Sequence, residues 1–97
     1  MSFIQIIDLK TSKYDDLMAF EAEWRAATEG KRTLRRSIVA QDRNNPGRYL
    51  VLAFFDDYES AMANSDLPET GEFAAKQAGI VDGPPSFIDL DVLADKN

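Results

Sequence analysis

The run RYLVLAFF at residues 48–55 is the feature that most limits how this chain can fold. Successive side chains of a strand point to opposite faces, and in this run both faces are apolar. Tyr49, Val51, Ala53 and Phe55 would share one face, and Leu50, Leu52 and Phe54 the other. The run FIQIIDL at 3–9 has the same property. Strands of this kind are buried on both sides, so each face of their sheet needs a cover.

Hydrophobic spacing and turn signals order the rest of the chain around these two strands. Leu17, Phe20 and Trp24 recur at helical spacing, and Asn-Asn-Pro-Gly at 44–47 is a strong turn signal. We expect strands at 3–9, 33–42, 48–55 and 86–93, and helices at 13–29, 57–64 and 68–78. This order is β-α-β-β-α-β with the second helical region divided in two, an α+β, ferredoxin-like pattern with an antiparallel four-stranded sheet. A length of 97 residues predicts a single domain, 1–97.

The pentapeptide LPETG at 67–71 matches the pattern that sortases cleave in wall-anchored proteins. That use requires a secretory signal before it and an apolar membrane segment after it. The first ten residues have neither a basic region nor a long apolar region, and the apolar runs after Gly71 fall far short of the ~18 residues of a spanning helix. We therefore expect a helix start, capped by Asp66 with Pro68 in its first turn. Ser12 and Asp56 are predicted to cap the other two helices.

Composition excludes several classes of function. The formal net charge is −6, which does not suit a nucleic-acid partner, since phosphate binding requires a basic face. The chain has no Cys and no His, so it lacks a thiolate nucleophile, the commonest general base and the commonest metal ligands. We expect no metal site, no membrane association and a cytoplasmic location.

The two-faced strands also predict self-association. Right-handed crossovers place both helical layers on one face of a β-α-β-β-α-β sheet. The other face would then expose an apolar patch larger than monomers normally tolerate. We expect a second copy of the chain to cover it, sheet against sheet, in a homodimer.

Two segments resemble a known family. RYLVLAFFDDYESAMA at 48–63 and NSDLPETGEF at 64–73, with the element order and length, are similar to the antibiotic biosynthesis monooxygenase domain of the dimeric α/β-barrel superfamily. The resemblance covers essentially the whole chain. It implies a dimer closed into an α/β barrel, with one pocket per subunit between the sheet and the helices.

The same resemblance bears on activity. The family includes cofactor-free monooxygenases of polycyclic aromatic substrates, haem-degrading enzymes, and members without known activity. The haem degraders carry Asn, Trp and His where this chain has Ile7, Phe55 and Phe73. None of the three is kept, so the resemblance does not extend to haem degradation, and no cofactor is expected.

The predicted pocket takes its residues from the odd-numbered face of the central strands, closed by two helices. Its members are Gln5, Ile7, Trp24, Tyr49, Val51, Phe55 and Phe73. Tyr49 and Gln5 would orient a phenol or carbonyl, and an arginine near the second strand, Arg36, would stabilise an anion. The alternatives are core packing for the apolar members and protection of an edge strand for the arginines. Asp89 and Asp91 are expected on a solvated face.

Two functions follow from these residues. The first is small-molecule binding with cofactor-independent monooxygenation of an aromatic or polyphenolic substrate. The alternative is a non-catalytic homodimer that binds a small apolar ligand or has a structural role. Fold resemblance favours the first function, and the scarcity of polar residues on the predicted pocket face favours the second.

Overall fold

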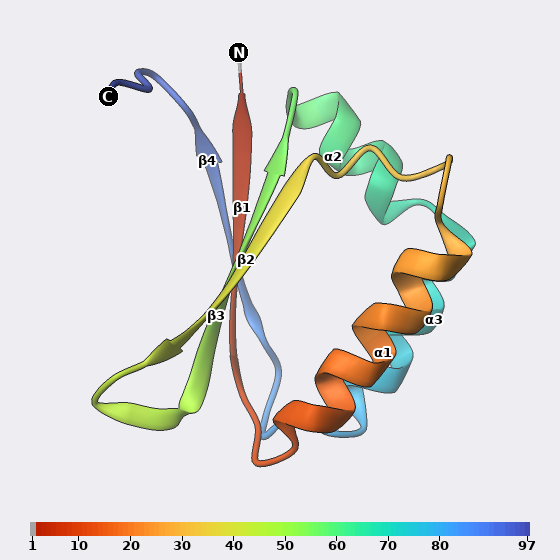
Figure 1. Ribbon diagram of the computed structural model, residues 1–97, viewed down its shortest axis with the longest axis vertical. Coiled ribbons are helices and arrows are strands. Elements are labelled where there is room, and N and C mark those ends of the chain that lie inside the picture. Colours follow the sequence, from red (N-terminus) through yellow and green to blue (C-terminus); the bar gives the residue numbers. More distant parts are fainter. Residues whose placement is uncertain (1) are drawn as a thin grey trace.

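A four-stranded antiparallel sheet forms one layer of the computed structural model, which describes residues 2–97. The strands are β1 (Phe3–Lys10), β2 (Arg36–Asp42), β3 (Asn45–Phe55) and β4 (Ser86–Asp91). They lie in the order β2-β3-β1-β4, so that the two strands with apolar faces are central. All three helices lie on one side of this sheet (Figure 1). The predicted ferredoxin-like arrangement is confirmed.

The helices are α1 (Tyr14–Ala27), α2 (Tyr58–Ser65) and α3 (Pro68–Ala78). The predicted caps are wrong by small shifts. Asp57 rather than Asp56 caps α2, because its side chain accepts a hydrogen bond from Ser60 N at 2.7 Å. Asp56 instead pairs with Arg35 across 2.6 Å. Of the two aspartates, the one next to the helix can reach its free N–H groups, and the other is left for an ion pair.

The starts of α1 and α3 have no side-chain cap. Helix α3 begins at Pro68, as predicted from LPETG, but Asp66 is the C-terminal cap residue of α2. Before α1, the Thr11 hydroxyl accepts a hydrogen bond from Lys13 N at 3.0 Å, and Ser12 is not the cap. The short spacing between α2 and α3 explains the first error, since one residue ends a helix and the next starts another.

The hairpin between β2 and β3 turns earlier than the sequence predicts. Its loop is Arg43–Asn44, and the Asp42 carboxylate accepts a hydrogen bond from Asn44 N at 2.8 Å. Strand β3 therefore includes Pro46 and Gly47. The pairing register between β2 and β3 is irregular after Gln41. Pro46, which has no backbone N–H to donate, lies at this irregularity, where the regular hydrogen-bond pattern between the strands is already interrupted.

The apolar core has two separate parts on the helix-covered face. Phe3, Phe55, Ala53 and Ala61 pack together next to α2. Leu9, Leu17 and Tyr49 pack together at the other end of the central strands, with Ile80 and Val81 against them. Because β1 pairs Phe3 with Phe55 and Leu9 with Tyr49, two cross-strand pairs, Gln5 with Ala53 and Ile7 with Val51, lie between these end pairs.

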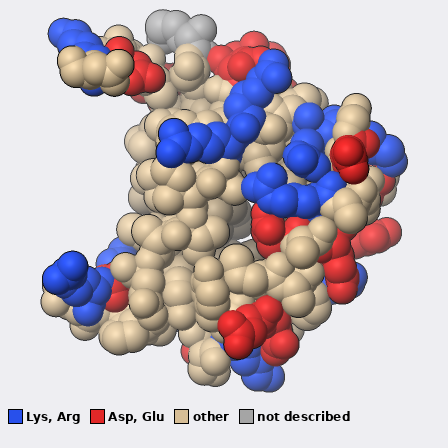
Figure 2. Space-filling view, in the orientation of Figure 1, with Lys and Arg blue, Asp and Glu red and all other residues tan. Residues whose placement is uncertain are grey.

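The other side of the sheet carries no helix (Figure 1). Even-numbered residues line this bare face, and its middle is formed by partly buried side chains of the three strands β1, β2 and β3: Ile4, Ile6, Ile38, Leu50, Leu52 and Phe54. At the β4 edge, Ile88 and Leu90 are 48% and 40% exposed. In Figure 2 this side is a hollowed, mostly uncharged surface with charged side chains above and below it.

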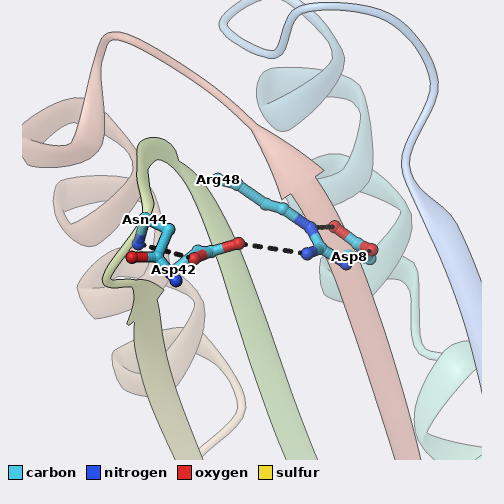
Figure 3. A network of polar contacts seen from close by, with 4 residues as sticks. All are labelled: Asp8, Asp42, Asn44 and Arg48. Carbon is cyan, nitrogen blue, oxygen red and sulfur yellow. Dashed lines mark hydrogen bonds and ion pairs between the residues drawn. The ribbon is translucent and has the colours of Figure 1, made fainter.

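An ion-pair group closes one end of the bare face (Figure 3). The Arg48 guanidinium donates to Asp8 at 2.7 and 3.1 Å and to Asp42 at 3.1 Å. These hydrogen bonds lower the pKa of the Asp8 carboxyl, and the Asn44 N–H followed by Arg48 lowers the pKa of Asp42. The ion-pair group thus links β1, β2 and β3 at this end of the sheet. Among residues 2–97, no helix is long and apolar enough to cross a membrane.

Candidate functional site

A cavity of about 320 Å³ lies between the sheet and the helices, where the two core clusters fail to meet. Two cross-strand rows form its floor. One row runs Val39, Val51, Ile7 and Phe87, and the next runs Ser37, Ala53 and Gln5, with Asp89 beyond them at the edge. The volume is near the lower end of the range for ligand pockets, about 300–1,000 Å³.

Small and polar side chains keep this space open. Ala53 is the central floor residue of its row, and its methyl group fills little volume. On α1, Leu17 and Trp24 each pack toward one end, and Glu21 lies between them on the same helical stripe. On α3 the stripe Thr70, Phe73 and Gln77 faces the same cavity. Ala53 on the floor and Glu21 on α1 therefore occupy central positions where a closed core would have large aliphatic residues.

The helix pair that roofs the cavity is antiparallel and held by polar contacts. Trp24 near the end of α1 donates its Nε1–H to Thr70 Oγ1 near the start of α3 at 3.0 Å. Lys76 and Glu23 pair across 2.6 Å further along the two helices. The indole is 9% exposed, and its hydrogen bond satisfies the one polar group that it carries. These contacts fix the roof without filling the space beneath it.

Glu21 is the only ionisable residue in the cavity lining of the described chain. Its carboxylate pairs with Arg25 in the next turn of α1, and Arg25 Nη2 donates to Ser37 Oγ at 2.7 Å. This chain of contacts joins α1 to β2 along one wall. Of the two partners in this ion pair, only Glu21 is part of the cavity lining.

Asn64 closes the end of the cavity beside α2. It is 7% exposed, and its Oδ1 accepts a hydrogen bond from Thr33 N at 3.3 Å. Its neighbour Ser65 donates its hydroxyl to Ala61 O at 3.1 Å. Asn64 thereby links the C-terminus of α2 to the segment before β2, and its amide group forms part of the lining.

The mouth of the cavity lies between α3 and β4. Four of its lining residues are exposed, and all of them come from α2, α3 or β4: Ser65, Gly71, Ala74 and Phe87. Phe87 has 58% of its surface exposed. The wall formed by α1 and β2 has no exposed lining residue. A ligand would therefore enter beside the β4 edge and meet Glu21 on the far side.

Six of the residues predicted for the pocket line this cavity. They are Gln5, Ile7, Trp24, Val51, Phe55 and Phe73. Gln5 donates its Nε2–H to Asp89 at 3.1 Å, which brings Asp89 to the helix-covered side of β4, where it is exposed. Among residues 2–97, no three or more Asp, Glu, His or Cys residues are arranged to hold a metal ion.

Two predicted residues lie elsewhere. Tyr49 is 8% exposed within the cluster of Leu9 and Leu17, outside the lining, with its ring stacked on Tyr14 at 5.0 Å between centroids. Its hydroxyl is 3.5 Å from Gln41 Nε2. Arg36 lies on the bare face, with its guanidinium 5.7 Å from the Phe54 ring centroid. Neither can touch a molecule in the cavity without a rearrangement.

Several lining residues were missed as pocket residues. Glu21 and Gln77 lie on helices, where polar residues usually indicate a solvent face. Their spacing from Leu17 and Phe73, at i+4 in both cases, was the available signal. Asn64 and Ser65 read as a turn between two helices, and Ser37 falls in a strand rich in polar residues. The odd numbering of Ser37 and Phe87 places them on the covered face once the register is known.

No family model and no curated protein matches the chain. Solved structures do. A protein named as an antibiotic biosynthesis monooxygenase from Nitrosomonas europaea matches with a TM-score of 0.81 at 11% identity, over 99% of this chain and 94% of the other. One of the same description from Caulobacter crescentus gives 0.82 at 14%, over 96% and 91%. SnoaB, a cofactor-independent oxygenase from Streptomyces nogalater, gives 0.80 at 9%, over 97% and 95%. The chain thus has the fold of an antibiotic biosynthesis monooxygenase-like domain.

Proposed function

We propose that this protein binds a small aromatic molecule in the cavity between its sheet and helices, and that it oxygenates this molecule with dioxygen and no cofactor. The cavity carries the proposal, because an apolar enclosure with a few convergent polar groups is the usual form of a ligand site. SnoaB, which has this fold, is described as a cofactor-independent oxygenase. The single domain 1–97 would be the binding unit.

The chemistry requires an electron-rich substrate. A phenol with an oxidisable ring CH₂ group, or its tautomer, can give four electrons to O₂. One oxygen atom then becomes a ring carbonyl, and the other leaves as water with the two hydrogens. The protein has to bind the phenol, exclude bulk water and orient it.

Within the cavity, Glu21 is our candidate for the group that accepts the phenol's hydrogen bond and draws off its proton. It replaces the arginine clamp expected from the sequence, because Arg36 lies across the sheet. The described lining also offers no cation to an anionic ligand, because its one ionisable residue is the Glu21 carboxylate and the nearby Arg25 is already paired with it. The proposed substrate is therefore neutral. Tyr49 keeps no role in this scheme, and Gln5 lines the floor.

Binding without catalysis is the second candidate. The lining offers one ionisable side chain and several amides and hydroxyls, which suffice to hold a ligand but give little acid–base chemistry. A carrier or sensor of a small apolar molecule would need no more than this. The two candidates differ only in whether oxygen is consumed.

We further propose that two copies associate through their bare faces. Partly buried aliphatic residues of β1, β2 and β3 form a continuous surface there, with ion pairs at its end. An apolar patch of this kind on a small monomer indicates a contact surface. The cavity mouth between α3 and β4 opens on the covered side of the sheet, so this contact leaves it accessible.

Oxygen uptake with neutral hydroxylated polycyclic aromatics tests the catalytic proposal. We expect uptake above a no-protein control, and a loss of about tenfold or more in Glu21→Gln, in line with the contribution of general bases. Asp16→Asn is the matched control, because Asp16 is an exposed acid on the same helix and lies outside this cavity. Two results together would support binding without catalysis. Oxygen uptake would equal the no-protein control with every substrate, and naphthalene would still bind with a measurable Kd.

A further inference from the structure

Gln77 differs from the other buried polar residues. Four polar residues are at most 8% exposed: Thr11, Thr28, Asn64 and Gln77. The first three each have a side-chain hydrogen bond, from Thr11 Oγ1 to Ile80 O, from Thr28 Oγ1 to Trp24 O, and from Thr33 N to Asn64 Oδ1. No side-chain hydrogen bond joins the Gln77 carboxamide to another described residue, and its polar atoms keep accessible surface, since among the described residues only Glu69 Oε1 is both shut off and unpartnered. An accessible amide without a protein partner can bind a molecule that reaches it.

Gln77 belongs to the lining of the cavity. It is the last cavity-lining residue of α3, two helical turns after Thr70. Phe73 and Ile80, which flank it at one turn on either side, both pack against the cluster of Leu9, Leu17 and Tyr49. Its amide therefore belongs to the end of the cavity farthest from Asn64. The walls around it there are apolar, with Leu17, Met18 and Ile7 among them.

We propose that the Gln77 carboxamide is the anchor for the polar end of the aromatic ligand, and that it makes the cavity specific for neighbouring oxygen substituents. A carboxamide presents a donor and an acceptor side by side. A ring with two adjacent hydroxyls, or a hydroxyl beside a carbonyl, matches both at once. The inference rests on the proposed function and names the substrate class more closely. Gln77 acts here in binding and selection, and the reacting position of the ring lies elsewhere.

The free protein provides the first test. Gln77→Met keeps the length of the side chain and removes an amide that has no partner in the free protein. We expect its Tm without ligand to equal or exceed that of the wild type, because no hydrogen bond within the protein is lost. Gln41→Met is the contrast, because the Gln41 amide lies outside the cavity and donates to Pro46 O at 2.7 Å, so its removal should lower the Tm. A fall in the Tm of Gln77→Met would assign the residue a structural role and overturn the proposal.

Ligand selectivity provides the second test. Equilibrium dialysis with 2,3-dihydroxynaphthalene and with naphthalene separates the hydroxyl contribution from the apolar one. We expect the wild type to prefer the diol, and Gln77→Met to weaken diol binding about tenfold, as for one or two lost hydrogen bonds. Naphthalene binding should stay the same or strengthen in this variant.

The two failures are distinguishable. If the wild type binds neither compound, the proposed function is wrong and the anchor falls with it. If the wild type binds naphthalene and the diol, and Gln77→Met keeps the same ratio between them, only the anchor is wrong. Gln77→Asn, which retains the amide but withdraws it from the cavity, should lose part of the preference for the diol.

Discussion

The two faces of the sheet are made by the same strands, yet one encloses a cavity and the other forms a continuous surface. On the covered face, Gln5, Ser37 and Ala53 share a cross-strand row between larger residues. On the bare face the middle row is Ile6, Leu52 and Ile38. Side-chain size and polarity at alternate positions therefore decide whether a sheet face leaves space or presents a contact. Backbone geometry cannot decide it, because both faces share one backbone.

The largest effect is expected from a charge in the middle of the bare face. Leu52→Arg should separate a dimer of twice 10.9 kDa into monomers and raise its dissociation constant by about 100-fold or more, because an uncompensated charge would be buried. Native mass spectrometry at micromolar concentration measures this. Ala19→Arg adds the same charge on an exposed position of α1 and should leave the dimer intact. A wild-type monomer would contradict the assembly that we propose.

A smaller effect on ligand binding is expected when an alanine is replaced by leucine, and it should differ between the two faces of the sheet. Ala53→Leu would fill the middle of the cavity floor and weaken naphthalene binding about tenfold or more, at a cost of roughly 1–3 kcal/mol in unfolding free energy from overpacking. Ala40→Leu adds the same volume on the bare face, where Ala40 is exposed, and should leave binding unchanged. Equilibrium dialysis and urea unfolding give the two quantities. Equal losses of binding in both variants would refute the position of the site.

The smallest effect concerns the ion-pair group at the end of the bare face. Arg48 lowers the pKa of Asp8, so the pair contributes stability above the unfolded pKa near 3.9 and loses it as the pH falls through the lower folded value. The Tm of Arg48→Met should be a few degrees below that of wild type at pH 7, and the difference should shrink as the pH falls below the unfolded pKa of about 3.9. Arg43→Met, in the exposed hairpin loop, is the control. A Tm difference that stays constant with pH would exclude this linkage.

The fold was predictable from sequence because its signals are local and agree with one another. Strand alternation, the Pro68 helix start and the element order each point to the same arrangement. Element ends were less predictable. Asp56 and Asp57 are adjacent residues of the same type, so the sequence alone does not tell which of them caps α2. Only the path of the backbone shows that Asp57 reaches the N–H groups of α2 and that Asp56 pairs with Arg35.

The site was predictable only as far as strand parity reaches. Odd numbering places Gln5, Ile7, Val51 and Phe55 on one face of the sheet, and all four line the cavity. Tyr49 has the same parity, but its row is closed by Leu17 from α1, a contact with no local signal. Gln77 and Glu21 depend on how two helices rotate against each other and against the sheet, and a single sequence does not encode that rotation in a readable pattern.

The strict alternation of the strands has a consequence for how such a protein can change over time. Odd positions of β1, β2 and β3 face the helix-covered side, where the cavity lies, and even positions face the bare surface. Substitutions at one parity can remodel what is held inside while leaving the other parity, and thus self-association, untouched. The ligand preference that we propose is therefore free to diversify without any change in the proposed contact between copies. An inserted or deleted residue within a strand has no such freedom, because it exchanges the two sets beyond that point.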